Sequence, residues 1–486
     1  MNFLKQIVFI FLFFVVGFLC KAQNKLGIEN SNYSSTNSIY LNPSSSVDSR
    51  TFMQLNLVGL NAYAMTNLAY IPNFSIWQVK KTGTIETPQI STINLKKFLY
   101  ANVTVDGPAF VMSKGEYGGG FFVRGRSVVD IRGIPYQLTN MLLNQNPNPS
   151  VPQKLDVNLR NLKLANMTWV EYGLNFGKMI RKEKDVIITM GGSLKYVTGV
   201  DIIYANLTRL NGHINDSTIN VKQMAAKARF NTPGWNTGGG MGVDFGVTYK
   251  KMLEKVDTYQ AHSKKSGCAF IDYKYKIGIS ILDFGYIRFN KNTYKANVSG
   301  SGNIPNYHKD SLNGVVKYDL HTSEQINSPI LATLPTALAF QFDWNFENHL
   351  YLNGTIIKNV VPNALTGVQS PNLLSICPRY EFKAFELAMP FTLQRFIYPQ
   401  LGFAFRVRSF VLGFDNVFPF LFKKNTYGLN VYFNLGISIF KNPACKQKGQ
   451  RAVDCPRDTI KNNYKSKKSK KSPSKKPPKK QSKPSY

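Results

Sequence analysis

The clearest alternation in the chain lies in residues 427–440, which read YGLNVYFNLGISIF. Apolar side chains occupy every second position from Tyr427 to Ile439, and mostly small or polar side chains lie between them. Because successive side chains of a β-strand point to opposite faces, this pattern predicts a strand with one apolar and one polar face. Strands of soluble sheets average about five or six residues, whereas strands that cross a membrane need about nine to eleven. The length of this run therefore favours a membrane-crossing strand.

The same period of two recurs in residues 243–250, 273–281, 338–347 and 401–408. Several of these segments carry Lys, Arg, Asp or Glu on one face and Phe, Tyr, Ile or Leu on the other. In a soluble sandwich the apolar faces would form a core, whereas in a transmembrane barrel they meet lipid and the charges line the lumen. We expect an all-β transmembrane antiparallel barrel of about fourteen strands. Polar inserts at 80–94, 144–156, 206–236 and 290–327 are predicted to be loops, and residues 135–143 a short helix.

The composition of the 486-residue chain agrees with this architecture. Charged residues make up 18%, below the roughly 25% of soluble proteins, although the formal net charge is +33. An apolar content of 43% is too high for a wholly disordered protein. After Leu19 no apolar run of about 18 residues occurs, which excludes a polytopic helical membrane protein.

The N-terminus has the organisation of a secretory signal. Lys5 precedes an apolar run over residues 7–19, and small residues follow at Cys20 and Ala22. We expect export, cleavage after Ala22 and a domain order of signal peptide (1–22), plug-like segment (23–50), barrel (51–440) and disordered tail (441–486). A lipoprotein signal with Cys20 as the lipidated residue is the alternative.

Residues 30–50 are rich in Ser and Asn. Such a segment is either disordered or forms an ordered turn at Leu41, Asn42 and Pro43 inside the lumen. At the other end, residues 441–486 carry a net charge of +14 and many Ser and Pro, a composition typical of disorder. In bacterial barrels both termini normally face the periplasm, so the tail would meet peptidoglycan or anionic lipid, or have no partner at all. Export argues against nucleic acid as its partner.

Four cysteines remain after the expected cleavage. Cys445 and Cys455 are close in sequence and are predicted to close a small disulfide loop, whereas Cys268 and Cys377 are predicted to be unpaired. Neither the cysteines nor the five histidines show zinc-ligand spacing, so we expect neither a metal nor a cofactor.

Six basic residues on the strands are candidates for a lumen cluster: Arg124, Arg126, Lys274, Lys276, Arg406 and Arg408. Such a cluster would attract anions or the carboxylate of an amphiphile. The alternative is that they pair with Asp244, Asp343 and Glu347 inside a polar barrel, and we favour this alternative.

Glycine runs at 118–120 and 238–242 lack the Lys-Ser/Thr of a phosphate-binding loop and fit strands that bend or crowd. No Gly-x-Ser-x-Gly motif is present, and we expect a protein that is not an enzyme.

Several short motifs together resemble an outer-membrane barrel family of unknown function from the Bacteroidota, which is itself similar to the long-chain fatty acid transporter superfamily. They are the turn at residues 41–45, the strand at 277–285 with the sequence IGISILDFG, and the segments 379–381, 401–406 and 412–416. Ser44 stands where the family has Ala, and the lysine-rich tail lies outside the pattern. The resemblance implies a roughly fourteen-stranded barrel with an N-terminal plug.

The resemblance also implies an outer-membrane location, contact with membrane lipid and passage or binding of small hydrophobic or amphiphilic molecules. The alternative is a structural or adaptor barrel of a secretion, gliding or surface-assembly complex, with its tail tethered to peptidoglycan.

Overall fold

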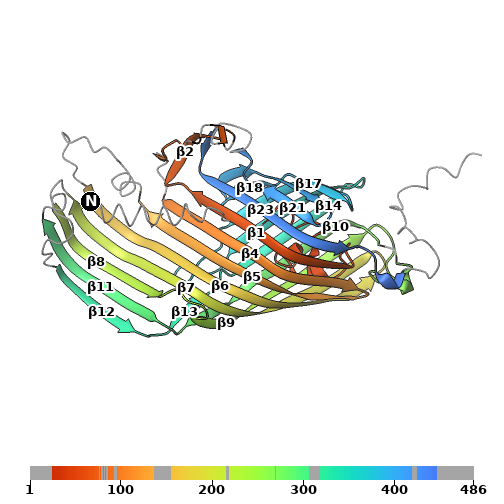
Figure 1. Ribbon diagram of the computed structural model, residues 1–486, viewed down its shortest axis with the longest axis horizontal. Coiled ribbons are helices and arrows are strands. Elements are labelled where there is room, and N and C mark those ends of the chain that lie inside the picture. Colours follow the sequence, from red (N-terminus) through yellow and green to blue (C-terminus); the bar gives the residue numbers. More distant parts are fainter. Residues whose placement is uncertain are drawn as a thin grey trace, which may run out of the picture. The chain divides into compact units, whose positions relative to one another are not determined.

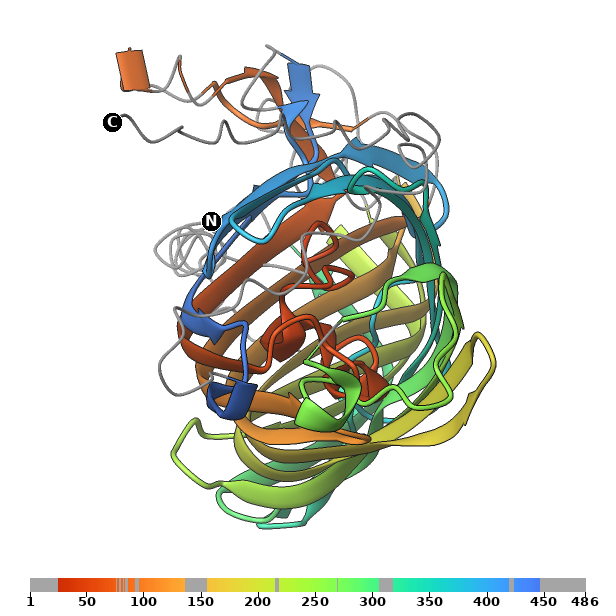
Figure 2. The ribbon, with the colours of Figure 1, turned by 90° about the vertical axis from the view of Figure 1, so that its right-hand side faces the viewer.

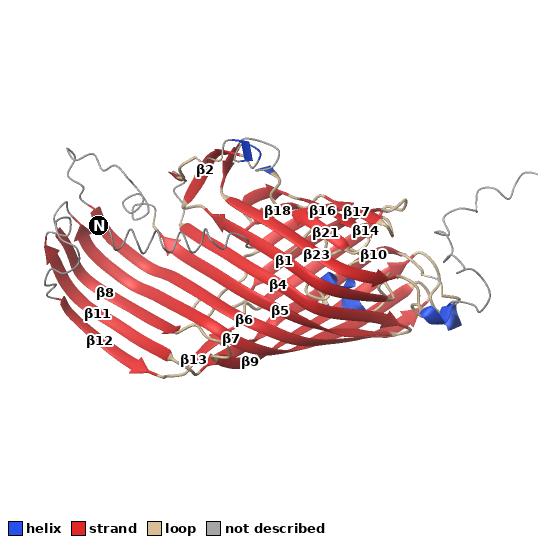
Figure 3. Cartoon of the chain, viewed as in Figure 1, coloured by secondary structure: helices blue, strands red, loops and turns tan. Residues whose placement is uncertain are grey.

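The computed structural model describes residues 25–445, apart from residues 76, 78–79, 82, 84–85, 92–95, 136–154, 215–217, 269, 306–317 and 419–423 (Figure 1). The expected signal peptide, all but the first residue of the predicted helix at 135–143, and almost all of the tail lie outside the described residues. Within the described part the chain is built almost entirely of strands, as the colouring of Figure 3 shows. No helix of this part is long and apolar enough to cross a membrane.

The strands form one closed antiparallel barrel with fourteen positions, which confirms the predicted fold. Pairing of the first strand with the last closes the barrel, with Met53 opposite Ile439. The positions are filled in order by β1 (Met53–Thr66), β4 (Lys97–Lys114), β5 (Tyr117–Ile134), β6 (Leu155–Glu183), β7 (Val186–Ile214), β9 (Gly238–Met252), β10 (Tyr273–Phe289), β14 (Ala337–Asn345), β15 (Leu350–Asn359), β16 (Leu373–Glu381), β17 with β18 (Phe385–Ala388, Phe391–Gln394), β19 with β20 (Tyr398–Leu401, Phe403–Val407), β21 (Phe410–Phe414) and β23 (Gly428–Ile439).

The two ends of the barrel differ. At one end, which we call the turn end, β1 begins, β23 ends, and tight turns at 115–116, 184–185 and 408–409 join neighbouring strands. At the other end, the loop end, longer connections run over residues 67–96, 360–372 and 415–427. A small sheet of β2 (Ala69–Phe74), β3 (Gln89–Ile90) and β22 (Lys424–Thr426) belongs to these connections. Short turns at one end and long loops at the other are typical of outer-membrane barrels.

Apolar side chains point outward and polar ones inward. On β23, Leu435 and Ile437 are exposed while Asn430 and Asn434 are buried, so the alternation read from the sequence has the predicted orientation. Outward-facing aromatic side chains stack near the turn end of β9, β10 and β14, where Tyr275 lies 5.9 Å from Trp344 between ring centroids. Aromatic girdles of this kind mark the membrane interfaces of such barrels.

One part of the wall extends beyond the barrel. β6 and β7 are each 29 residues long, and near the loop end β7 pairs with β8 (Thr218–Asn231) instead of β9. β8 then pairs with β11 (Thr293–Pro305), and β11 with β12 (Tyr318–Ile326), so that these strands extend to the left in Figure 1. β13 (Ile330–Thr333) leads back to β14. The prediction of loops at 206–236 and 290–327 was therefore wrong in large part, because these polar segments pair with one another as strands.

Residues 25–50, which we call the lumen segment, lie inside the barrel (Figure 2). The segment contains one helical turn, α2 (Ser35–Ser38), and a 3-10 turn, η1 (Pro43–Ser46). Its apolar residues Leu26, Ile28, Ile39 and Leu41 are each at most 2% exposed and pack on inward-facing side chains of the wall.

Candidate functional site

The predicted turn at Leu41, Asn42 and Pro43 lies in the lumen against β9, β10 and β14. The side chain of Asn42 accepts a hydrogen bond from the backbone N–H of Ser44 and so caps η1. Its amide also donates to Gln341 at 3.1 Å, and the carbonyl oxygen of Leu41 accepts from the Ser280 hydroxyl at 2.6 Å. The turn is thus bonded both within the segment and to the wall.

Glycines in the wall leave the space that the lumen segment occupies. A Cβ added at Gly118 would lie 2.1 Å from the carbonyl oxygen of Ser46, and one at Gly191 2.7 Å from that of Pro43. At Gly246 the added atom would lie 2.2 Å from Oδ1 of Asn42. Only glycine permits so close an approach of two backbones. Crowding therefore explains Gly118, as the sequence suggested.

A layer of buried charge lies next to the lumen segment toward the loop end. Arg124 and Arg126 donate to Glu171 at 2.7 and 3.1 Å, and Arg126 also pairs with Asp283 at 2.6 Å. Lys195 pairs with Asp244 at 2.6 Å and with Asp283 at 2.5 Å. Three cations and three carboxylates thus share one network, which we call the charged layer. The guanidinium carbon of Arg124 also lies 4.4 Å from the ring centroid of Tyr40 in the lumen segment.

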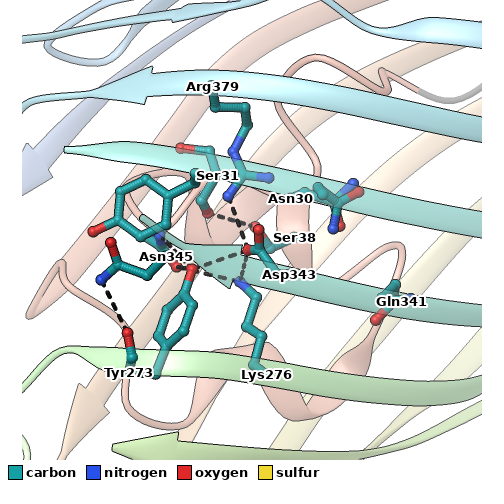
Figure 4. A network of polar contacts seen from close by, with 12 residues as sticks. Asn30, Ser31, Ser38, Tyr273, Lys276, Gln341, Asp343, Asn345 and Arg379 are labelled. Carbon is teal, nitrogen blue, oxygen red and sulfur yellow. Dashed lines mark hydrogen bonds and ion pairs between the residues drawn. The ribbon is translucent and has the colours of Figure 1, made fainter. Parts of the chain in front are cut away.

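A second polar network lies at the turn end (Figure 4). Asp343 accepts from Arg379 at 2.9 Å, from Lys276 at 3.0 Å and from the Tyr273 hydroxyl at 2.9 Å. Arg379 also pairs with Glu381 at 2.8 Å. The lumen segment joins this region through Asn32, whose amide donates to Glu381 at 2.8 Å.

The six basic residues singled out in the sequence do not form one cluster. Arg124 and Arg126 belong to the charged layer, Lys276 pairs with Asp343, and Arg406 pairs with Glu386 at 2.8 Å. Lys274 and Arg408 are exposed outside the lumen, so the sequence-based assignment of these two was wrong. Lys274 falls at a register shift in the pairing of β10 with β9, and Arg408 lies in the turn before β21.

The expected pairing of these charges is only partly as the sequence suggested. Asp244 and Asp343 do pair with lumen cations, but Glu347 is exposed in the turn after β14. Glu171 and Asp283 carry most of the pairing and were not identified. Glu171 shares the inward face of β6 with Met167 and Trp169, so a carboxylate within an apolar alternation was the available signal. Asp283 lies in a bulge of β10 with a positive φ of 53°.

An apolar layer lies between the charged layer and the loop end. On β6, β7 and β10 the inward residues Trp169, Val197 and Ile287 lie nearer the loop end than the charged residues of the same strands. Trp169 is fully buried, and its indole N–H donates to Glu171 at 2.7 Å. The large side chains of this layer are Tyr63, Met65, Phe98, Tyr100, Val128, Met167, Trp169, Val197, Ile202, Tyr204, Ile287, Phe289, Ile330, Leu334 and Val368.

The connection between β9 and β10 closes over the exit of the lumen segment at the turn end. Asp48 accepts from the Tyr259 hydroxyl at 2.6 Å and pairs with Lys250 at 2.8 Å, and Arg50 pairs with Asp272. The same connection is fixed to the end of the barrel by a disulfide between Cys268 and Cys445.

This disulfide corrects the predicted pairing of Cys445 with Cys455, and Cys268 is not free. The two bonded cysteines are 177 residues apart but have Cα atoms 6.2 Å apart, because the β9–β10 connection and the end of β23 meet at the turn end. Cys455 lies outside the described residues. Cys377 is free and buried, as predicted.

Three further features bear on chemistry. A cavity of about 60 Å³ lies between the lumen segment and β9, β10 and β14, so this part of the lumen is almost filled. Within the described residues, no group of three His, Cys, Asp or Glu side chains has the arrangement of a metal site. Burial raises the pKa of Glu29, in the lumen segment, to about 7.

The closed fourteen-stranded barrel, its apolar outer face and its polar inner face define an outer-membrane β-barrel. The chain belongs to the family of unknown function DUF5723, whose model matches residues 43–415. This agrees with the resemblance seen in its short motifs.

Among solved structures the chain is similar to the toluene transporter TbuX of Ralstonia pickettii, with 10% identity, a TM-score of 0.41, and coverage of 83% of this chain and 94% of that one. It is also similar to the outer membrane protease OmpT of Escherichia coli, with 7% identity, a TM-score of 0.18, and coverage of 80% and 95%. Similarity at this level does not extend to ligands or activity. No curated protein matches the sequence.

Proposed function

We propose that this barrel binds and passes small hydrophobic or amphiphilic molecules, with the lumen segment acting as a movable plug. The loop end faces the exterior and the turn end faces the periplasm, where the basic tail also lies. The signal peptide, cleaved after Ala22, directs export.

The apolar layer carries this proposal. The lumen of a water-filled porin is polar. Here fifteen large apolar side chains form one buried cluster on the loop-end side of the charges. Small-molecule sites are mostly apolar with a few placed polar groups, and Glu171 and Arg126 supply such groups at the inner edge of this layer. An aliphatic or aromatic molecule entering from the exterior would therefore be stabilised here and a hydrated ion would not.

The contacts of the lumen segment support a plug that can move. The segment contacts the wall through many hydrogen bonds and ion pairs, including Lys25 with Asp106 and Asp48 with Lys250. Both ion pairs are buried, so the segment can leave its place only when another charged group of the lumen replaces each lost partner. Tyr40 of the lumen segment contacts Arg124, and Trp169 of the apolar layer donates to Glu171. Because Arg124 and Glu171 form an ion pair, the lumen segment and the apolar layer are connected through this pair.

We infer passage rather than catalysis because the buried charges satisfy one another. Glu171, Asp283 and Asp244 each accept from a cation, and the arrangement is that of a structural layer.

Native mass spectrometry of protein extracted gently from its own outer membrane tests the proposal. A lipid-like or other apolar mass bound to the single chain, and lost in a variant with Trp169→Ala, supports it. A second protein at fixed ratio, with no apolar mass, would instead favour the adaptor role and overturn the proposal.

A further inference from the structure

A cavity of about 560 Å³ opens at the loop end and shares Phe98 with the apolar layer. This volume lies within the range of about 300–1,000 Å³ that is typical of small-molecule sites. Among the described residues that line it, four are basic (Lys96, Arg132, Lys358 and Arg395) and one, Asp130, is acidic. We call it the mouth cavity.

The buried charges of the mouth cavity do not balance. Asp130, whose side chain is 1% exposed, lies 3.0 Å from Arg132 and 3.7 Å from Arg395. The two arginine side chains are only 21% and 25% exposed, and Asp130 is the one carboxylate among the described residues of the lining. Arg132 also donates to the neutral side chains of Asn363 and Gln369. The Nε atom of Arg395 is buried and has no hydrogen-bond partner.

A third cation adds to the imbalance. Lys163 is opposite Arg132 in the pairing of β6 with β5, is 9% exposed, and donates to the backbone carbonyl of Asn363 in the cavity wall. Two largely buried arginines thus contact one buried carboxylate, and a third largely buried cation lies on the neighbouring strand. Burying charge without a counter-charge is costly, and the charged layer deeper in the lumen shows no such excess.

The remaining wall is rich in amides. Asn359, Asn363, Gln369 and Asn372 line the cavity together with Ser370. The oxygens of Asn363 and Gln369 accept from Arg132, and a carbonyl oxygen with two lone pairs can accept a second bond from a hydroxyl group. The ring of Phe98 backs the guanidinium of Arg395 at 3.8 Å from its centroid, which holds the guanidinium in place.

We propose that the mouth cavity binds a phosphate- or carboxylate-bearing sugar of about monosaccharide size, with the anion against Arg132 and Arg395 and the hydroxyl groups against the amides. The anion supplies the missing negative charge. Arginine suits this role because its planar fork matches carboxylate and phosphate groups. This inference goes beyond the proposed function, since it concerns an anion bound by arginines and amides and not an apolar molecule, although Phe98 belongs to both places.

Isothermal titration calorimetry on the full-length protein in detergent tests the inference, with glucuronate and inorganic phosphate as probes and glucose as the neutral control. We expect saturable binding of glucuronate, weaker binding of phosphate, none of glucose, and a decline with added salt. Arg395→Gln should weaken glucuronate binding at least tenfold. Arg181→Gln, which changes an arginine 62% exposed at the turn end, should leave it unchanged.

Asp130→Asn keeps the test decisive if Arg395→Gln does not fold. Removing the competing carboxylate should tighten glucuronate binding several-fold, a gain that misfolding cannot produce. If lipid A in nanodiscs competes with glucuronate for binding, the natural source of the anion is a lipid headgroup. If lipid A does not compete, the natural ligand is a soluble sugar. Failure of glucuronate to bind the wild type, or equal affinity in all variants, would overturn the inference.

Discussion

The guanidinium carbon of Arg124 lies 4.4 Å from the centroid of the Tyr40 ring, and the same guanidinium donates to Glu171 at 2.7 Å. Arg124, a residue of β5, thereby contacts the lumen segment on one side and Glu171, the hydrogen-bond partner of Trp169, on the other. This contact connects the proposed plug to the proposed binding layer.

Replacing Glu171 by Ala should destabilise the barrel strongly. Arg124 and Arg126 stay buried but lose the carboxylate that they share. Breaking a buried ion pair lowers the free energy of unfolding by about 3–5 kcal/mol. The free energy of unfolding in lipid vesicles, from guanidinium titration, measures the effect. Glu183→Ala is the control, because Glu183 and its partner Arg181 are more than half exposed and should contribute at most about 1 kcal/mol. If both variants lost the same free energy of unfolding, Glu171 would not stabilise the barrel as a buried partner of Arg124 and Arg126.

Gly118→Ala should displace the lumen segment while the barrel remains folded. The new Cβ would lie 2.1 Å from the carbonyl oxygen of Ser46, and relieving such overpacking costs about 1–3 kcal/mol. Hydrogen exchange of amides in residues 25–50 should then accelerate about tenfold or more. Gly125→Ala on the same strand is the matched control, since nothing lies within 4 Å of its added Cβ. Unchanged protection in Gly118→Ala would show that the segment does not occupy this place.

Docking of the lumen segment should weaken as the pH rises. Burial raises the pKa of Glu29 from its ordinary value of 4.5 to about 7, against the opposing influence of Lys25 and Arg124 and with a smaller contribution from Asp106. The docked state therefore binds the proton more tightly, so its stability is fullest below pH 4.5 and falls as the pH rises toward 7. The loss is about 3 kcal/mol.

Hydrogen exchange of residues 25–50, corrected for intrinsic rates, measures this dependence. In Glu29→Gln the protection should vary much less over this pH range and should exceed that of the wild type at neutral pH. The same pH dependence in the variant would assign the effect to another group.

Leu435→Arg should cost about 2–4 kcal/mol if this outward side chain faces the middle of the bilayer. Leu435 is 43% exposed on β23, between the inward-facing Asn434 and the outward-facing Ile437. Unfolding in lipid vesicles gives the cost, and Leu435→Ala separates the loss of the side chain from the added charge. A negligible difference between the two variants would mean that Leu435 does not face lipid.

The strands and their faces were predictable from sequence because a period of two is a direct consequence of strand geometry. The alternation at 427–440 predicts both the strand and the outward direction of Leu435. In the extension, β8 has polar residues on both faces, so no alternation distinguishes it from a loop. β11 does alternate, but one face holds polar residues and the other has small residues such as Ala296, Gly300 and Gly302, so its apolar face is weak.

The site depends on register between strands, which a single sequence does not contain. Asp283 was noted within a motif, yet its role follows from the contacts of its carboxylate with Arg126 on β5 and Lys195 on β7. The disulfide is a similar case, since proximity of Cys445 to Cys455 in the chain said nothing about where Cys268 lies.

The most direct test of the proposed function uses Trp169 as a reporter in the apolar layer. The chain has four tryptophans, so replacing Trp77, Trp235 and Trp344 by Phe leaves Trp169 as the sole emitter. Titration with brominated dodecanoate should quench its fluorescence saturably, at about one ligand per chain. A variant that keeps only the outward-facing Trp344 should show unsaturable quenching from the surrounding lipid or detergent. If Trp169 is not quenched, or its quenching does not saturate, the apolar layer is not a binding site and the proposed function is wrong.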